Sequence, residues 1–226
     1  MPNWCNNEVV ISGPPAQITR LLEKGRGDEG RFFLSNIYPC PENLRKVSAG
    51  SEEDFYRVKH GTMTEWERYR SYEWVAKLNG GEAPTTREQV IAALEKRHSD
   101  FHKKADQYKR NLEEHGHATW YTWCVANWGT KWDIEAHIAP RDENDDTGQL
   151  NFDSAWSPPV DAFVEISSQF PELRIECRYF EEGCNFIGVC IIEDGAVVAE
   201  DEDSCDSDNL DRFEFAPMRE EDWDEE

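Results

Sequence analysis

Residues 160–180 read VDAFVEISSQFPELRIECRYF, and within this stretch the spacing of apolar residues changes from that of a helix to that of a strand. Up to Gln169 the apolar side chains recur at helical spacing: Val160, Phe163, Val164 and Ile166. LRIECRYF at 173–180 then alternates between apolar and polar residues, as a strand with one buried face does. The chain therefore places a helix directly before a strand.

Further strands are predicted on both sides of this pair. NFIGVCII (185–192) and AVVAE (196–200) are joined through Glu193-Asp194-Gly195, which predicts a hairpin of the Asp-Gly type. On the other side, LNFDSAW (150–156) alternates before Ser157-Pro158-Pro159. ATWYTWCVANW (118–128) and WDIEAHIAP (132–140) are aromatic or β-branched and alternate as well, so each predicts a strand.

The N-terminal segment supplies one more strand and one more helix. NEVVIS (7–12) reads as a strand that stops at Gly13-Pro14-Pro15, and PAQITRLLEK (15–24) reads as a helix. With residues 43–118 set aside, the element order is βαββαβ, the split βαβ or ferredoxin-like arrangement. We therefore predict an α+β fold: a ferredoxin-like βαββαβ antiparallel sheet with a helical insertion and an added C-terminal hairpin.

The predicted division of the chain has four parts. Residues 1–42 are the N-terminal strand-helix part of the core, 43–118 a charged helical insertion, 119–200 the remainder of the ferredoxin-like core, and 201–226 an acidic tail. The tail is expected to be mostly structureless, with Phe213 to Phe215 and Trp223 as its candidates for docking.

The insertion carries two helical patterns. The first runs from Thr64 to Gly80-Gly81, and the second begins at a predicted capping box formed by Thr85 and Glu88. At about 30 residues the second helix would be about 45 Å long, longer than a small domain is wide. We therefore expect it either to project or to break near His98.

Charge is distributed unevenly along the chain. Residues 1–118 hold equal numbers of acidic and basic residues, whereas residues 119–226 hold 6 basic and 29 acidic ones, so this half carries the whole net charge of -23. Such a field repels nucleic-acid phosphates and attracts basic protein surfaces. It predicts either a solvated acidic tail or a surface that imitates a polyanion. The candidate partner-binding residues are Glu200, Asp201, Glu202, Asp203, Asp206, Asp208 and Asp211.

Signatures of catalysis are missing from the sequence. Walker A, HExxH and GxSxG are all absent. His98 and His102 are spaced for one helix face without a convincing third ligand, and the seven scattered Cys residues read as buried thiols in a reduced protein. We predict no catalytic residue, metal site or cofactor. Because the chain also has no long apolar run and no targeting pattern at its N-terminus, a cytoplasmic protein without a membrane partner is expected.

Four short motifs resemble one family. They are MPNWCNN at 1–7 with Ile11 and Gly13, PCP at 39–41, NWGTKWD at 127–133 and SAWSPP at 154–159. Together they are similar to the YubB-like family of plasmid and phage proteins, whose members carry MPNWC, WGTKWD and TAWSPP and have a ferredoxin-like C-terminal domain. Ser154 stands where Thr is usual. The resemblance implies a fold and a mobile-element origin, and it implies no catalytic residue.

The Trp-rich motifs allow two interpretations. In the structural one, Gly129 forms a tight turn, Lys131 pairs with Asp133, and the Trp rings pack at the base of the sheet. In the functional one, the rings line a small-molecule or peptide site. The candidate ligand-binding residues are Trp4, Asn127, Trp128, Lys131, Trp132 and Trp156.

Three functions follow as hypotheses. The first is a non-catalytic phage or plasmid accessory protein that binds a host protein with a basic surface, in its narrower form as an acidic DNA mimic in counter-defence. The second is a single-stranded nucleic-acid-binding protein that combines a Trp-lined sheet with basic residues of the insertion: Lys96, Arg97, Lys103, Lys104, Lys109 and Arg110. The third is an enzyme with a Trp-lined pocket.

Overall fold

The computed structural model describes residues 3–47, 50–61 and 65–213. The chain divides into two compact units, one made of residues 1–39 and 124–226 and the other of residues 40–123. We call the first the sheet unit and the second the helical unit. The helical unit holds 14 basic and 14 acidic residues, so the sheet unit carries the net charge of -23.

A six-stranded antiparallel sheet forms the sheet unit, in the order β2-β3-β1-β4-β5-β6. The strands are β1 (Trp4–Ser12), β2 (His137–Ile138), β3 (Thr147–Ala155), β4 (Arg174–Glu181), β5 (Phe186–Glu193) and β6 (Ala196–Asp203). The predicted α+β class is confirmed, and so is the hairpin that joins β5 to β6. β1 lies between β3 and β4 although both follow it by more than 130 residues.

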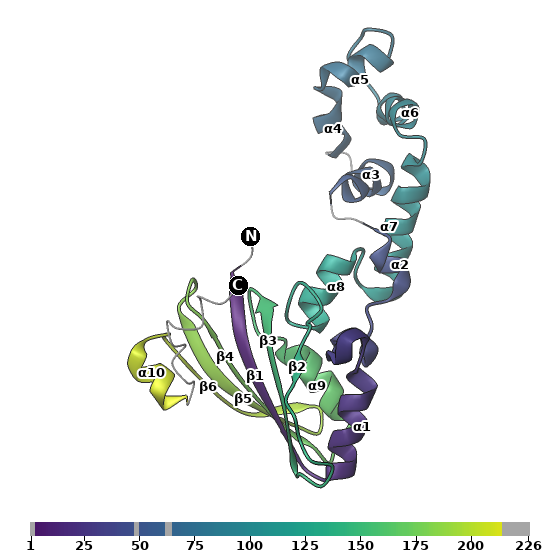
Figure 1. Ribbon diagram of the computed structural model, residues 1–226. Coiled ribbons are helices and arrows are strands. Elements are labelled where there is room, and N and C mark those ends of the chain that lie inside the picture. Colours follow the sequence, from purple (N-terminus) through teal and green to yellow (C-terminus); the bar gives the residue numbers. More distant parts are fainter. Residues whose placement is uncertain (1–2, 48–49, 62–64, 214–226) are drawn as a thin grey trace. The chain divides into compact units, whose positions relative to one another are not determined.

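Two helices cover one face of this sheet and a third lies on the other face. α1 (Pro15–Gly25) and α9 (Val160–Gln169) occupy the first face, and α10 (Ser207–Arg212) the second (Figure 1). Alternate residues of β1 are buried toward α1 and α9: Cys5, Asn7, Val9 and Ile11. Each fully buried aliphatic side chain in this layer contributes about 1.5–3 kcal/mol through loss of water contact.

Residues 120–127 form a helix, α8 (Trp120–Asn127), so the strand predicted over 118–128 is wrong. Aromatic and apolar residues stand at nearly every position there, and they satisfy the period of a strand as well as that of a helix. The Thr119 hydroxyl accepts the N–H of Thr122 at 3.2 Å and thereby starts a helical turn. That local hydrogen bond, which alternation does not reveal, favours the helix.

The strand predicted over 132–140 shrinks to β2, which pairs with Asn151 and Leu150 of β3. Asp133 accounts for the irregular chain before it. Its carboxylate accepts the backbone N–H of Leu34 at 2.9 Å and that of Ser35 at 3.3 Å, so it caps the short 3₁₀ helix η2 (Leu34–Asn36). The segment is therefore tied to the N-terminal part of the chain. A second short 3₁₀ helix, η1 (Asp28–Gly30), precedes it.

The part of the predicted acidic tail that the structure describes, residues 201–213, is ordered, so the expectation of a mostly structureless segment is wrong for this part. β6 continues to Asp203, and Phe213 is only 6% exposed. Phe213 and Leu210 pack against Ile187 on the sheet face opposite α9, and this apolar contact holds α10 in place. Phe215 and Trp223 lie outside the described residues.

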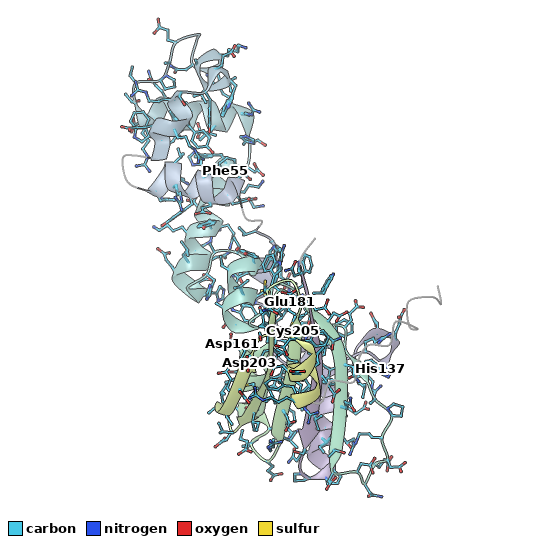
Figure 2. All side chains as sticks on the ribbon, turned by 90° about the vertical axis from the view of Figure 1, so that its left-hand side faces the viewer. Phe55, His137, Asp161, Glu181, Asp203 and Cys205 are labelled. Carbon is cyan, nitrogen blue, oxygen red and sulfur yellow. The ribbon has the colours of Figure 1, made fainter. Side chains whose placement is uncertain are left out.

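The helical unit contains α2 (Glu42–Arg45), α3 (Ser51–His60), α4 (Glu65–Arg70), α5 (Glu73–Leu78), α6 (Arg87–Arg97) and α7 (Phe101–His115), and α8 begins within it. Its core includes Phe55 and Phe101, whose ring centroids are 5.1 Å apart in an edge-to-face pair. Phe55 is marked in Figure 2. None of the helices among the described residues is both long and apolar enough to cross a membrane.

Two expectations for this unit are corrected and one is confirmed. The predicted break near His98 is present, between α6 and α7. The helix predicted over 64–81 is divided into α4 and α5, and Thr64 lies outside the described residues. The capping box uses Thr86 and Gln89 rather than Thr85 and Glu88, because the Thr86 hydroxyl accepts the N–H of Gln89 at 3.3 Å.

Candidate functional site

Three motifs from distant parts of the sequence meet at one end of the sheet. Asn7 of β1 donates from Nδ2 to the Ser154 hydroxyl of β3 at 2.9 Å, and that hydroxyl donates to the Ser157 carbonyl at 2.7 Å. The Ser157 hydroxyl in turn donates to the carbonyl of Gly129. Because Asn7 and Ser154 are buried, these bonds form in an environment where each carries more weight than in water. They fix the NWGTKWD turn against SAWSPP.

The backbone of this region has positive φ angles at two positions, a conformation that glycine adopts readily and other residues rarely do. Gly129 has φ +80°, and a Cβ there would lie 3.1 Å from the Pro158 carbonyl oxygen and 3.2 Å from Oδ2 of Asp161, a residue of α9 marked in Figure 2. Trp156 has φ +75°, which is uncommon for a bulky residue with a Cβ. Such a conformation costs about 1–3 kcal/mol and persists only where neighbouring contacts enforce it.

The six candidate ligand-binding residues divide into two groups. Trp128 is 3% exposed and donates from Nε1 to the Tyr38 carbonyl at 2.9 Å, while the Tyr38 hydroxyl donates to Oδ1 of Asn127 at 2.8 Å. These two residues therefore serve packing. Trp4, Trp132 and Trp156 are 53%, 38% and 39% exposed, and they form the surface part of the motif.

Lys131 joins the exposed rings into one cluster. Its Nζ lies 4.6 Å from the ring centroid of Trp132 and 4.8 Å from that of Trp156. The Trp4 ring lies 6.0 Å from the Trp132 ring. We call Trp4, Lys131, Trp132 and Trp156 the Trp cluster. An ammonium over two indole faces is held by the negative electrostatic potential of each ring.

The buried Cys thiols are poor candidates for a catalytic nucleophile. Burial raises the pKa of Cys5 to about 12 and that of Cys190 to about 11, and it raises the pKa of Cys177 well above its usual value. These thiols stay protonated near neutral pH, whereas a nucleophile needs the thiolate. Within residues 3–47, 50–61 and 65–213 no three His, Cys, Asp or Glu side chains are grouped so that they could hold a metal ion.

The predicted acidic surface is split between the two faces of an edge strand. The register of β6 against β5 places Glu200 and Glu202 on the α9 side and Asp201 and Asp203 on the α10 side. Arg212 of α10 pairs with Asp203 at 3.0 Å and also with Asp201. Two of the seven acidic residues are thereby neutralised within the molecule. Charges along an exposed edge also prevent pairing with other strands.

The other three acidic candidates belong to α10 or to the segment before it. Asp206 accepts the N–H of Asn209 at 2.9 Å and so caps the start of α10. Asp208 and Asp211 lie within the helix, and the side chain of Asp208 is exposed. Asp203 and Cys205 mark the passage from β6 toward α10 in Figure 2.

The basic residues proposed for nucleic-acid binding mostly have partners inside the helical unit. Lys96 donates to the Leu78 carbonyl at 3.0 Å, and Arg97 lies 4.3 Å from the Trp74 ring centroid. The remaining contacts are Lys104 with Glu52 and Asp100, Lys109 with Glu113, and Arg110 with Gln107. Intramolecular pairing reduces the positive field that phosphates would meet.

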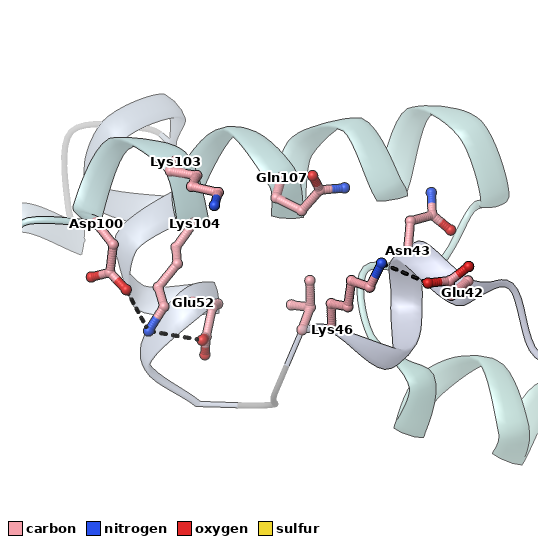
Figure 3. A pocket seen from close by; sticks show the side chains of 9 residues that line it. Glu42, Asn43, Lys46, Glu52, Asp100, Lys103, Lys104 and Gln107 are labelled. Carbon is pink, nitrogen blue, oxygen red and sulfur yellow. Dashed lines mark ion pairs between the residues drawn. The ribbon is translucent and has the colours of Figure 1, made fainter.

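Lys103 and Lys104 line a cavity of about 660 Å³ in the helical unit (Figure 3). Its lining residues are Glu42, Asn43, Lys46, Val47, Glu52, Asp100, Lys103, Lys104 and Gln107. Lys104 bridges Asp100 at 3.1 Å and Glu52 at 3.4 Å, and Lys46 pairs with Glu42 at 2.7 Å. With three ammonium groups facing three carboxylates, the cavity carries balanced charge and favours no single ligand class.

Several residues that the sequence did not single out stabilise the Trp cluster and the acidic strand. Asn7 and Ser154 join the motifs, Arg212 binds two acids of β6, and buried Glu181 accepts the N–H of Gly183 at 2.7 Å in the β4–β5 turn. Asn7 stands at a buried position of an apolar strand, which was a usable signal. Arg212 offered none, because its pairing depends on the position of α10.

Comparisons with known proteins match different shares of the chain. Residues 127–226 match the family described as "Ferredoxin-like domain in Api92-like protein". "Uncharacterized protein YubB" of Escherichia coli (strain K12) is 28% identical over 78 residues, which cover 34% of this chain and 54% of that protein, so the chain spans about half the length of this relative. The crystal structure of api92 from Yersinia pseudotuberculosis has 14% identity and a TM-score of 0.45, covering 91% of this chain and 99% of that one.

Proposed function

We propose, from the match of residues 127–226 to the family described as "Ferredoxin-like domain in Api92-like protein", that the chain is a non-catalytic protein that binds a partner protein through a basic surface of that partner. The observation that carries the proposal is the Trp cluster. Three Trp side chains remain between 38% and 53% exposed, although hydrogen bonds through Asn7, Ser154 and Ser157 tie together the motifs that carry them.

Exposure of this kind favours binding over packing. Large aromatic residues are mostly buried in folded proteins, as Trp128 is, and a cluster of exposed Trp side chains is informative where a single exposed ring is not. Trp is enriched among the residues that dominate protein–protein interfaces, because it supplies a large contact area with few rotatable bonds. The positive φ of Trp156 costs conformational energy, and its ring is exposed as well. A functional contact of this ring would explain why the chain keeps both features.

Charge selects the class of partner. The Trp cluster belongs to the unit that carries the net charge of -23, and this field accelerates association with basic protein surfaces. The same field opposes polyanions, which weighs against a nucleic-acid ligand at this site. A cytoplasmic host protein with an exposed basic segment fits the proposal.

The DNA-mimic form of the proposal is the weaker one. Mimicry needs carboxylates that follow one surface as phosphates follow a strand. Glu200 and Glu202 face one side of β6, and Asp201 and Asp203 face the other and bind Arg212. We therefore assign the acidic residues a role in attraction, and the Trp cluster the specific contact.

We also propose a finer description of the fold. β1, α1, β2, β3, α9 and β4 follow the βαββαβ order, and their strands lie in the order β2-β3-β1-β4 of a split βαβ arrangement. On this view the ferredoxin-like core includes β1 and α1, which precede residues 127–226. The helical unit is then an insertion between α1 and β2, and β5–β6 extends the sheet.

Binding of defined probes tests the proposed function. Isothermal calorimetry would compare a peptide of alternating Arg and Gly, a Glu-Gly peptide of equal length and a single-stranded oligonucleotide, each at low and at physiological ionic strength. We expect only the Arg peptide to bind, with an affinity that falls as salt rises. Binding of the oligonucleotide instead would favour the nucleic-acid function, and the absence of Arg-peptide binding at low salt would refute the proposal.

A further inference from the structure

The Lys131 ammonium lies against the rings of the Trp cluster, where a cationic ligand of that cluster would bind. Its Nζ lies 4.6 Å and 4.8 Å from the ring centroids of Trp132 and Trp156, two residues that belong to different motifs. Since Trp132 follows α8 and Trp156 follows β3, folding has to bring the two rings together. One ammonium group thus contacts the faces of two Trp rings that come from different motifs.

Hydrogen bonds that do not involve the side chains of the Trp cluster position the Trp156 backbone and the chain before Trp132. The Trp156 N–H donates to the Asn3 carbonyl at 3.0 Å, and the Thr130 hydroxyl donates to the Ala155 carbonyl at 2.9 Å. Thr130 is buried, so its bond is shielded from water. Replacing the Lys131 ammonium should therefore leave the spacing of the rings in place.

We propose that Trp132 and Trp156, flanked by Trp4, form a recognition site for an arginine or lysine side chain of the partner, and that Lys131 occupies this site until the partner displaces it. This inference rests on the proposed function and names the chemical group that its site recognises. A partner cation entering the site repeats a contact that Lys131 already makes, and the charge of the sheet unit attracts that cation.

If Lys131 competes with the partner cation for the Trp rings, removing its ammonium should strengthen binding of the partner. Lys131→Met keeps most of the aliphatic side chain and removes the ammonium, so a partner cation no longer has to compete for the rings. We expect the Arg-Gly peptide to bind Lys131→Met about threefold to tenfold more tightly than the natural protein, from the usual strength of one cation–π contact. A peptide with citrulline in place of arginine has the same shape without the charge and should bind neither protein.

Lys24→Met is the matched control, because it removes one positive charge from the same unit. Lys24 lies 5.8 Å from the Phe170 ring centroid and donates to Gln169, the last residue of α9, whereas the Trp cluster adjoins the start of that helix. The two ends of this ten-residue helix are about 15 Å apart. Lys24→Met should therefore change peptide affinity less than Lys131→Met does.

Two further measurements complete the test. Trp132→Leu should weaken peptide binding and abolish the gain from Lys131→Met, whereas Tyr72→Leu, at an exposed aromatic residue of the helical unit, should leave binding unchanged. By NMR, ring currents should shift the Lys131 ε-protons upfield in the free protein, and the peptide should return them toward ordinary values.

The outcomes separate this inference from the function on which it rests. Peptide binding that ignores Trp132→Leu, or equal gains from Lys131→Met and Lys24→Met, would overturn the aromatic site while a basic partner remained supported. If the Arg-Gly peptide binds neither the natural protein nor Lys131→Met, the aromatic site and the proposed function both fail.

Discussion

Asn7 of β1 donates a hydrogen bond to Ser154 of β3 across the buried face of the sheet, over 2.9 Å between Nδ2 and Oγ. The same Asn7 amide donates to the Cys5 carbonyl at 2.7 Å. Through the Ser154 hydroxyl, which reaches the Ser157 carbonyl, the first strand of the sheet is connected to the loop that carries Trp156. A polar pair in the core thus positions an aromatic group on the surface.

Ser154→Ala is predicted to destabilise the protein by about 1–3 kcal/mol, because buried Asn7 loses an acceptor and the Ser157 carbonyl loses a donor. The free energy of unfolding in urea measures this cost. Ser154→Thr keeps the hydroxyl and should cost less than about 1.5 kcal/mol, since one methyl group must fit in a packed site.

Ser168→Ala is the matched control for this pair, because exposed Ser168 donates only to the Glu165 carbonyl within its own helix. Its effect should stay within about 0.5 kcal/mol. Equal losses for Ser154→Ala and Ser168→Ala would show that the buried hydroxyl does not hold the motifs together.

Much of the fold was accessible from sequence where one periodicity dominates. Helix α9 and strand β4 were predicted because apolar spacing changes between Gln169 and Leu173, and the β5–β6 hairpin because Asp194-Gly195 marks its turn. Failure came where aromatic residues fit two periods, as over α8. It also came where a side chain controls the backbone from a distance, as Asp133 does at Leu34.

The candidate site was harder to predict from the sequence, because contacts between distant residues determine it. Sequence reasoning selected Trp4, Lys131, Trp132 and Trp156 from their motifs, yet ring exposure depends on the backbone angle of Trp156 and on the hydrogen bonds that fix it. The acidic residues of β6 were selected by charge alone. Their division between two faces follows from strand register, and the neutralising Arg212 lies on a helix that was not predicted.

Thr86→Ala should destabilise the helical unit by about 1 kcal/mol, since the Thr86 hydroxyl caps α6 by accepting the Gln89 N–H. Thr85→Ala loses the bond from the exposed Thr85 hydroxyl to Gln89 Oε1 at 3.2 Å but keeps the backbone N–H that donates to the same oxygen at 2.7 Å, so it should cost less than about 0.5 kcal/mol. Unfolding followed by circular dichroism compares the two variants, and a larger loss for Thr85→Ala would reverse the assignment of the cap.

Phe213→Ala should release α10 from the sheet without unfolding the sheet. Phe213 is 6% exposed and packs against Ile187, and removal of a buried Phe ring costs about 3 kcal/mol or more. Arg212→Ala removes ion pairs between half-exposed groups and should cost less than about 1 kcal/mol. Hydrogen exchange of the amides of 207–212 should therefore accelerate far more in Phe213→Ala, while exchange in β1 and β4 stays slow. Equal acceleration in both variants would assign the docking of α10 to charge.

Acid should weaken the β4–β5 turn through Glu181. Burial by itself raises the pKa of this carboxyl, but hydrogen bonds from Cys184 and from the Gly183 N–H outweigh it, so the pKa lies below its usual 4.5. A group with a lowered folded pKa stabilises the fold above the unfolded pKa, and this contribution disappears as pH falls through the folded value. Glu181→Gln should therefore be less stable than the natural protein at neutral pH, and the difference should shrink below about pH 4.5. Urea unfolding across this range measures it, with exposed Glu182→Gln as the control. A difference that grows on acidification would mean that Glu181 is bound better in its protonated form.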